Sequence, residues 1–456
     1  MKLLTVDDAR ARMLAEIAIL PAEAVPLSQS IGRVLAEDVV AVRDQPPFAA
    51  SAMDGWAVRA ADCPGTLTIV GESAAGHGFE GAVGPGEAVR IFTGAAVPLG
   101  CDAVVIQEDA ERDGETVRVP AVEAGHAVRP AGGDFAAQAV LLTRGTRIDP
   151  WRLSLAASAG RATVSVYRRP RVALLSTGEE IVEAPATPGP FQIYDSGVPA
   201  LAAIIALWGA TVIRAKPVRD TLEAVVEALR GADADLVVTV GGASVGDHDL
   251  VRAAAQALGL SLRVESVKVR PGKPTFFGVF GDGRGLLGLP GNPASAFVCA
   301  ELFLGPILGR YQGVGSPELP LRAAKLRSSL PANGPREHWM RGKLFYTDGE
   351  LHVLPFRDQD SSLVSIFAAA DALVVRGVNA SAAGVGDLVE VLPLSRAERI
   401  AMISPITETA TSQGALPPMS RPIGARSLPK ALSGAPSARS GARRSAIRRR
   451  APNRPT

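Results

Sequence analysis

The sequence has few of the residues that indicate a disulfide scaffold, a zinc site or a membrane span. Its only cysteines, Cys63, Cys101 and Cys299, lie far apart and form no CxxC pair. Such spacing is typical of a protein from a reducing compartment. The chain also lacks an apolar run of about 18 residues and, at its beginning, the apolar segment of a signal peptide. We therefore expect a cytoplasmic protein that contacts no membrane.

An excess of positive over negative charge is found only at the end of the chain. Residues 401–456 contain ten of the 48 Lys and Arg residues but, in Glu408, only one of the 46 acids; residues 1–400 thus hold 38 basic and 45 acidic residues, a net charge of −7 against +2 for the whole chain. Enzymes that bind nucleic acid usually carry positive charge on the folded body, so we expect no nucleic-acid partner. The composition of residues 403–456, rich in Pro, Ser, Ala, Gly and Arg, predicts a disordered basic tail.

Three patterns follow one another along the chain and predict a multidomain α/β protein. After an amphipathic helix expected over residues 7–20, residues 1–168 contain short Val-rich strands between Gly and Pro, which predict β-rich modules, most simply two subdomains. Residues 169–312 alternate apolar strands with helical segments, which predicts a doubly wound, mostly parallel sheet. Residues 318–400 return to short strands and predict a small β-barrel or sandwich.

Several common catalytic motifs are absent. The chain has no GxxxxGK[ST] loop, no GxGxxG after a strand, no HExxH pair and no GxSxG elbow, and its five histidines are scattered. These absences argue against a P-loop nucleotidase, a dinucleotide-binding enzyme, a zinc protease with an HExxH motif and an α/β-hydrolase.

Gly-rich loops instead follow the strands expected in residues 169–312. Ligands of such sheets bind outside the carboxyl ends of the strands. The loop STGEE, residues 176–180, offers backbone N–H groups for an anion, but Glu179 and Glu180 would repel a phosphate unless Mg²⁺ bridged them. An acidic helix start, which the helix dipole favours, explains the same two acids equally well.

Other loops carry comparable chemistry. GGASVGDHD, residues 241–249, repeats the combination of glycines, a Ser hydroxyl and acids, and PGKP brings Arg270 and Lys273 around a turn that suits an oxyanion. In GLPGNPASA a helix is expected to start at Pro293 or Ala294. In the N-terminal region, SAMDG is also readable as a plain β-turn, and Arg129 with Asp134 as a surface ion pair.

These motifs, in this order, resemble the molybdopterin molybdenumtransferase family, which includes the MoeA-type enzymes and the E domain of gephyrin. The resemblance covers about residues 1–400 and is carried by the series SAMDG, TGAAVPLGCDAVVIQE, RPAGGD, STGEE, IYDS, GGASVGDHD, PGKPTFFG and GLPGNPAS. It implies that the sheet domain is of the molybdopterin-binding type and that residues 318–400 form a β-barrel. It also implies a homodimer, in which the N-terminal motifs of one subunit face the sheet-domain site of the other.

The reaction implied by the resemblance inserts molybdenum from molybdate into adenylylated molybdopterin, with Mg²⁺-dependent release of AMP. Contact with the molybdopterin adenylyltransferase or with molybdoenzymes is then a further expectation. Carried over motif by motif, the catalytic acids are Asp54, Asp134, Glu180, Asp220 and Asp249, of which Glu180 and Asp249 would bind the metal. The positions that would bind substrate are Thr93, Arg129, Ser176, Thr177, Gly178, Asp195, Ser196, Gly242, Ser244, Gly246, Arg270, Pro271, Gly272, Lys273, Pro290, Gly291, Asn292 and Ser295.

The chain departs from the family pattern at a few positions, and two other functions compete with the transferase. Ala49 and Ala50 stand where the family has an acid and an amide before SAMDG, Gly197 replaces the Asn after IYDS, and Arg270 replaces a Lys. Adenylylation of molybdopterin is the first alternative, but that related family is a single short domain. A scaffold protein that has kept the fold is the second, and the retained acids argue against it.

Overall fold

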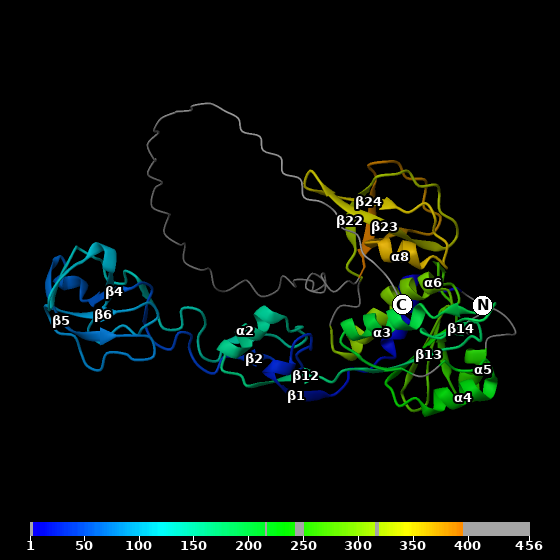
Figure 1. Cartoon of the computed structure of the whole chain (residues 1–456), viewed down its shortest axis with the longest axis horizontal. Coiled ribbons are helices and arrows are strands. Elements are labelled where there is room, and N and C mark those ends of the chain that lie inside the picture. Colours follow the sequence, from blue (N-terminus) through cyan, green and yellow to red (C-terminus); the bar gives the residue numbers. More distant parts are fainter. Residues whose placement is uncertain (1–2, 215–216, 242–249, 315–318, 395–456) are drawn as a thin grey trace, which may run out of the picture. The chain divides into compact units, whose positions relative to one another are not determined.

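The computed structural model of the chain describes residues 3–214, 217–241, 250–314 and 319–394 (Figure 1). The predicted tail therefore lies outside the described residues. Within them the predicted fold class is confirmed, since β-rich regions, a sheet domain with parallel strands and a closed β-barrel follow one another along the chain. No described helix is both long and apolar enough to cross a membrane.

The middle of the chain forms a six-stranded sheet in the order β16-β13-β17-β21-β20-β18. The first four strands of this order are parallel, and β20 runs antiparallel to both of its neighbours. The bounds of its strands are β13 Arg171–Ser176, β16 Thr211–Arg214, β17 Leu236–Val240, β18 Ser261–Val264, β20 Phe276–Val279 and β21 Gly285–Leu289. The bounds of its helices are α3 Gly197–Leu207, α4 Leu222–Gly231, α5 Leu250–Ala257, α6 Pro293–Cys299, the π-helical turn η4 Ala300–Leu304 and α7 Gly305–Tyr311.

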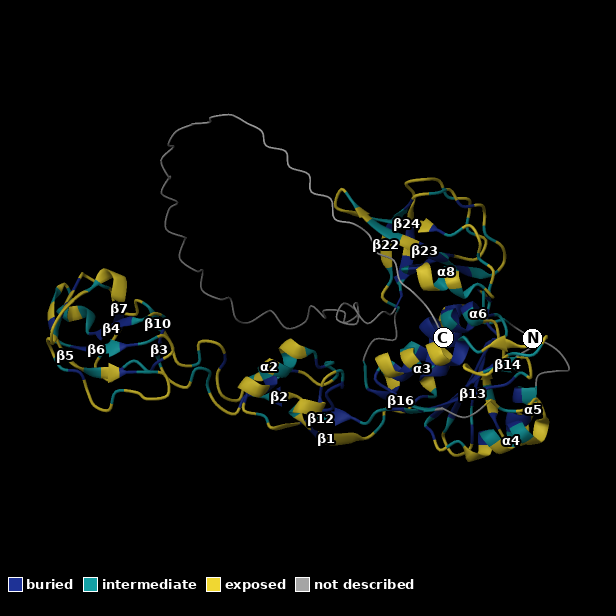
Figure 2. Cartoon of the chain, in the orientation of Figure 1, coloured by how far each residue is buried: buried dark blue, intermediate teal, exposed yellow. Residues whose placement is uncertain are grey.

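Apolar side chains on both faces explain why the strands of this sheet read as continuous apolar runs. In β13, Val172 and Leu174 pack on the side of α3, α6 and α7, whereas Ala173 and Leu175 pack on the side of α4 and α5. Figure 2 shows the result as buried strands between helices that are exposed on their outer sides. The two faces confirm the predicted doubly wound arrangement.

The first helix belongs to the core of the sheet domain rather than to the β-rich region that follows it. This helix, α1 (Val6–Ala15), is capped by Thr5, whose hydroxyl accepts a hydrogen bond from the Asp8 N–H at 3.1 Å. Its buried side chains, such as Met13, join the same cluster as β13 and α7. It ends at Ala15, so the helix expected over residues 7–20 is shorter than predicted.

Two small β-rich units make up residues 22–167. The first has its own core around α2 (Pro150–Ser158), and the second is a six-stranded sheet in the order β7-β4-β6-β5-β9-β8. The elements of the first unit are β1 Ala22–Pro26, η1 Leu27–Gln29, β2 Val39–Val40, β11 Val140–Leu142, α2 and β12 Thr163–Tyr167. Those of the second are β3 Ala50–Ser51, β4 Gly55–Val58, η2 Ala60–Asp62, β5 Gly65–Ser73, β6 Glu87–Ile91, β7 Ala103–Ile106, η3 Gln107–Asp109, β8 Glu111–Asp113, β9 Thr116–Val119 and β10 Val128–Arg129.

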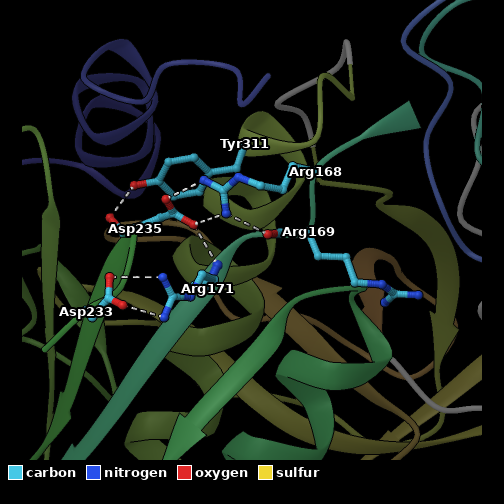
Figure 3. Close-up of polar contacts among 6 residues, drawn as sticks. All are labelled: Arg168, Arg169, Arg171, Asp233, Asp235 and Tyr311. Carbon is cyan, nitrogen blue, oxygen red and sulfur yellow. Dashed lines mark hydrogen bonds and ion pairs between the residues drawn. The ribbon is translucent and has the colours of Figure 1, made fainter. Parts of the chain in front are cut away.

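Hydrogen-bonded ion pairs connect residues 168–171, between β12 and the start of β13, to Asp233 and Asp235 before β17 (Figure 3). The Arg168 guanidinium donates to both carboxylate oxygens of Asp235, at 3.0 and 2.7 Å, and the Arg171 N–H donates to the same carboxylate at 2.7 Å. The Arg171 side chain binds both oxygens of Asp233, and the Tyr311 hydroxyl donates to the Asp235 carbonyl. This network lies where the parallel strands begin, at the opposite end of the sheet from the Gly-rich loops.

The C-terminal strands close into a barrel, because β23 pairs with both β24 and β25 while β22 and β26 complete the ring. The bounds are β22 Arg322–Leu326, β23 Glu337–Thr347, β24 Glu350–Pro355, α8 Val364–Ala369, β25 Ala372–Arg376 and β26 Leu388–Pro393. One short strand from the sheet-domain segment, β19 (Val269–Arg270), pairs in parallel with Glu337 and His338 of β23. The PGKP loop therefore begins on the barrel.

Candidate active site

Backbone pairing brings the predicted N-terminal site residues together, although they are far apart in sequence. Strand β3 pairs with β10, opposing Ala50 to Arg129, and Ser51 exchanges backbone hydrogen bonds with Gly94 and Ala95 at 2.8 and 2.9 Å. Gly132 and Asp134 donate backbone hydrogen bonds to Pro46 and Gln45. The SAMDG, TGAAVP and RPAGGD segments thus form one group, which carries Asp54, Thr93, Arg129 and Asp134.

Asp54 is held in place by Thr93. Both the N–H and the hydroxyl of Thr93 donate to the same Asp54 carboxylate oxygen at 2.7 Å. These hydrogen bonds, with a contribution from Arg90, lower the pKa of Asp54 below its ordinary value. Arg90 also donates to the Gly55 carbonyl at 3.0 Å and to the Gln107 side chain at 2.7 Å, and its guanidinium lies over the Trp56 ring. Asp54 is therefore a fixed, ionised carboxylate at neutral pH.

Replacement of Thr93 by Val should raise the pKa of Asp54 part of the way toward its ordinary value. The variant loses the hydroxyl donor but keeps the backbone N–H, which is the larger of the two causes. A carbon-detected NMR titration of the Asp54 carboxyl group measures this directly. Thr93→Ser, which keeps the hydroxyl, is the matched control and should titrate like the native protein. An unchanged pKa in Thr93→Val would show that the hydroxyl contributes nothing.

A second group lies at the carboxyl ends of the parallel strands. The Thr177 N–H donates to the Val240 carbonyl at the end of β17, and the Ser176 carbonyl accepts from Val218, two residues before the exposed Asp220. Gly241 is in the left-handed region with φ 89°, and a Cβ there would lie 2.6 Å from the Thr177 carbonyl oxygen. A Cβ on Gly291 would lie 3.4 Å from the Gly241 Cα. Thr177, Gly241 and Gly291, which follow the ends of β13, β17 and β21, therefore pack closely against one another.

This second group contains polar atoms without partners. Among the described residues, the buried Thr177 Oγ1 and the Asp195 Oδ2 form no hydrogen bond. The other carboxylate oxygen of Asp195 accepts from the N–H groups of Gly197 and Val198, both at 3.0 Å, at the start of α3. Ser196 is the N-cap residue of α3, but its side chain makes no capping hydrogen bond. Buried polar atoms of this kind usually bind a partner, which is consistent with a ligand at this end of the sheet.

Four of the predicted residues belong to a segment that is not described. Gly242, Ser244, Gly246 and Asp249 lie outside the described residues, so only Glu180 of the predicted metal pair is described. The Glu180 carboxylate is exposed and folds back over Gly178, where a Cβ would lie 2.7 Å from one of its oxygens. Within the described part of the chain, no three His, Cys, Asp or Glu side chains gather into a metal site.

The turn of the PGKP loop packs against the buried side chain of Cys299. Gly272 has φ 115°, and a Cβ at this position would lie 2.2 Å from Cys299 Sγ. The Thr275 hydroxyl donates to the Gly272 carbonyl at 2.8 Å and lies 3.0 Å from the same sulfur. Burial raises the pKa of Cys299 to about 12, so the thiol stays protonated and uncharged. Thr275 and Cys299 therefore hold the turn that presents Arg270, Pro271 and Lys273.

Helix α6 starts at Pro293, as predicted. The backbone N–H of Ala294, in its first turn, already donates a hydrogen bond to another part of the chain. Asn292 is the N-cap residue of α6, and its side-chain amide donates to the Ser361 hydroxyl at 2.8 Å. The Ala294 N–H donates to the Ser361 carbonyl at 3.0 Å, and Ser295 is buried. A loop of the barrel thus covers the helix start and occupies the Asn292 amide and the Ala294 N–H.

Sequence reasoning missed a buried arginine of the barrel. Arg341 is fully buried, and its Nη2 donates to the Asp360 carbonyl at 3.0 Å, next to Ser361. Its Nε and Nη1 have no hydrogen-bond partner among the described residues. Nearby His338 is also buried; burial, followed by the charges of Arg270, Arg341 and Arg336, lowers its pKa to about 4. His338, which pairs with Arg270 at the start of the PGKP loop, is therefore neutral and lies among several arginines.

The chain matches family models over most of its described length. The models are the MoeA N-terminal region (domain I and II) at residues 4–160, a probable molybdopterin binding domain at residues 173–310 and the MoeA C-terminal region (domain IV) at residues 323–394. A molybdopterin molybdenumtransferase of Nostoc is 36% identical over 77% of this chain and 84% of its own length. One from Haemophilus influenzae is 32% identical over 86% of this chain and 99% of its own length. The chain belongs to the molybdopterin molybdenumtransferase family.

Solved structures agree with this membership. A molybdopterin biosynthesis MoeA protein from Pyrococcus horikoshii has a TM-score of 0.75 and 30% identity, covering 87% of this chain and 100% of its own. Another structure, also of a molybdopterin biosynthesis MoeA protein from Pyrococcus horikoshii, has a TM-score of 0.73 and 26% identity and covers 86% of this chain and 99% of its own. The predicted family and the predicted enzyme class, a transferase of molybdenum cofactor biosynthesis, are thus confirmed.

Proposed function

We propose that this chain inserts molybdenum from molybdate into adenylylated molybdopterin and releases AMP in a Mg²⁺-dependent step. The observation that carries the proposal lies at the carboxyl ends of the sheet. There the turns that follow the strands meet a loop of the barrel, through the contacts of Asn292 with Ser361 and of Arg341 with Asp360. On one side lie the turns at Thr177, Gly241 and Gly291, with a Thr177 hydroxyl that has no hydrogen-bond partner among the described residues. On the other side lie the PGKP loop and Arg341.

The backbone loops suit the diphosphate of a nucleotide substrate. Gly241 and Gly291 let the chain pack closely where β17 and β21 end, and backbone N–H groups of such turns are common ligands of phosphate. Residues of the predicted set at this place are Ser176, Thr177, Gly178, Asp195, Ser196, Pro290, Gly291 and Asn292.

The barrel side suits an oxyanion such as molybdate. Arg341 has two N–H groups that form no hydrogen bond in the described part of the chain, although the Asp358 and Asp360 charges act on it, and charge-assisted hydrogen bonds to an oxyanion are strong. Arg270 and Lys273 add charge from the PGKP loop. His338 would remain neutral at neutral pH, since its pKa is lowered to about 4, and so adds no further positive charge.

Glu180 fits a role in holding Mg²⁺. Mg²⁺ is usually bound by one or two carboxylates together with phosphate oxygens, and the exposed Glu180 carboxylate follows the phosphate-cradling turn directly. Asp249 is the proposed second ligand. When bound, the ion would neutralise charge on the phosphate oxygens and on the departing AMP.

Asp54 and Asp134 are proposed to serve the metal-insertion side of the reaction, and Asp220 to act beside the STGEE loop. Among the described residues, no hydrogen bond or ion pair joins the group around Asp54 to the group around Thr177. We propose a homodimer in which one subunit supplies the group around Asp54 and its partner supplies the group around Thr177. We further propose a cytoplasmic location and contact with the adenylyltransferase or with acceptor molybdoenzymes.

The deciding measurement follows AMP release and dithiolene-bound molybdenum in the same reaction. Purified protein should release AMP from adenylylated molybdopterin only when both Mg²⁺ and molybdate are supplied, and both products should appear together. Protein that binds the nucleotide but releases no AMP with either molybdate or tungstate would contradict the proposal. The alanines at positions 49 and 50 would then be the first positions to restore to an acid and an amide.

A further inference from the structure

The segment of residues 179–196, here called the return loop, is held mainly by hydrogen bonds. It leaves the STGEE turn, folds back and ends at α3, and its two short strands β14 (Ile181–Val182) and β15 (Ile193–Tyr194) pair only with each other among the described strands. Its apolar side chains pack little, since Phe191, Ile193 and Tyr194 are 92, 61 and 51% exposed. Burial of apolar surface therefore contributes little to its conformation.

Gln192 joins the two arms of the return loop through its side-chain amide. Its Nε2 donates to the Glu179 carbonyl at 2.9 Å, and its Oε1 accepts from the Gly189 N–H at 3.0 Å. The next residue continues the contact, because the Ile193 N–H donates to the Glu180 carbonyl at 2.7 Å. The peptide groups on both sides of the Glu180 Cα are thus fixed by residues 192 and 193.

These contacts hold the backbone from which the Glu180 carboxylate projects. The side chain folds back over Gly178, so that its oxygens lie 2.7 and 2.8 Å from the place of a Gly178 Cβ. An exposed carboxylate on an unrestrained backbone would sample many positions. Since the Glu179 carbonyl is bound by Gln192 and the Glu180 carbonyl by Ile193, the backbone from which this side chain projects is restrained on both sides.

We propose that Gln192 is a positioning residue for the divalent ion, acting through the backbone of Glu180. The inference rests on the proposed function in one respect, the role of Glu180 as a metal ligand. Groups that orient a metal ligand commonly contribute about 10- to 100-fold to metal affinity. Gln192 itself does not touch the ion or the substrate.

The test uses Mn²⁺ as the probe, because the same oxygen ligands bind Mn²⁺ and Mg²⁺. Mn²⁺ binding is measured by electron paramagnetic resonance in the presence of AMP, on the full-length protein. Gln192→Leu keeps the volume and loses both hydrogen bonds, and we expect about 10- to 100-fold weaker Mn²⁺ binding. The Ile193 N–H should also exchange with solvent faster. Gln256→Leu, on the exposed side of α5, is the matched control and should leave both readouts unchanged.

A double-variant cycle separates positioning from a merely structural role. In a Glu180→Gln background the metal ligand is already gone, so Gln192→Leu should weaken Mn²⁺ binding no further. Equal losses in both backgrounds, or unchanged Mn²⁺ affinity in Gln192→Leu, would overturn the inference. The inference would also be overturned if Glu180→Gln left the Mn²⁺ affinity as high as that of the native protein. Failure to release AMP contradicts only the proposed function, because the binding and exchange readouts do not depend on turnover.

Discussion

Glu180→Gln is expected to lower the rate of AMP release by about 10²- to 10³-fold, the usual cost of removing one group directed at developing charge. The variant keeps the size of the side chain and loses its negative charge, which the proposed Mg²⁺ site requires. Its fold should be unaffected, because the carboxylate is exposed and no hydrogen bond or ion pair to it is found among the described residues. Rates are measured with adenylylated molybdopterin, molybdate and Mg²⁺ at saturating concentrations.

Glu179→Gln provides the matched control for this prediction. It makes the same chemical change on the neighbouring exposed residue, whose carbonyl, rather than its carboxylate, binds Gln192. We expect activity close to that of the native protein. Equal losses in the two variants would mean that the negative charge of the loop matters but the position of Glu180 does not. Full activity in Glu180→Gln would remove Glu180 from the proposed metal site.

Local sequence signals were sufficient for the elements that depend on periodicity and on glycine. The apolar run RVALLS became β13, buried on both faces, and the PGNP turn started α6 at Pro293. The glycines at 178, 241 and 272 all have positive φ, as expected of tight turns where strands end. These features are decided within a few residues, so a single sequence reveals them.

Contacts between distant segments could not be predicted in this way. Nothing in the residues around α6 indicates that Ser361, nearly 70 positions later, would bind Asn292 and cover the helix start. Only a weak indication of Arg341 is present in the sequence: it is a charged residue two positions after Trp339, on the same buried face of β23. Gln192 gave no signal, because its importance lies in the return of the chain to Glu179 and not in its own neighbourhood.

Gly272→Ala is expected to destabilise the protein and to weaken molybdate binding together. The new Cβ would lie 2.2 Å from Cys299 Sγ, at a φ of 115° that side chains rarely adopt. Overpacking costs about 1–3 kcal/mol and a left-handed residue about 1–2 kcal/mol, so the free energy of unfolding should fall by roughly 2–5 kcal/mol. Because the turn carries Arg270 and Lys273, molybdate affinity should fall at least about tenfold. Urea unfolding and titration calorimetry with molybdate measure the two effects.

The double variant Gly272→Ala/Cys299→Ala tests whether the buried sulfur is the cause. Removing the sulfur leaves room for the new methyl group but does not relieve the strain in φ, so the double variant should recover part of both losses. Cys299→Ala alone removes a fully buried side chain and its contact with Thr275, and should be mildly destabilising. The effects of the two substitutions must therefore be non-additive, with the second one beneficial only in the presence of the first. Strict additivity would mean that Cys299 does not limit the turn and that the backbone conformation of Gly272 alone makes glycine necessary there.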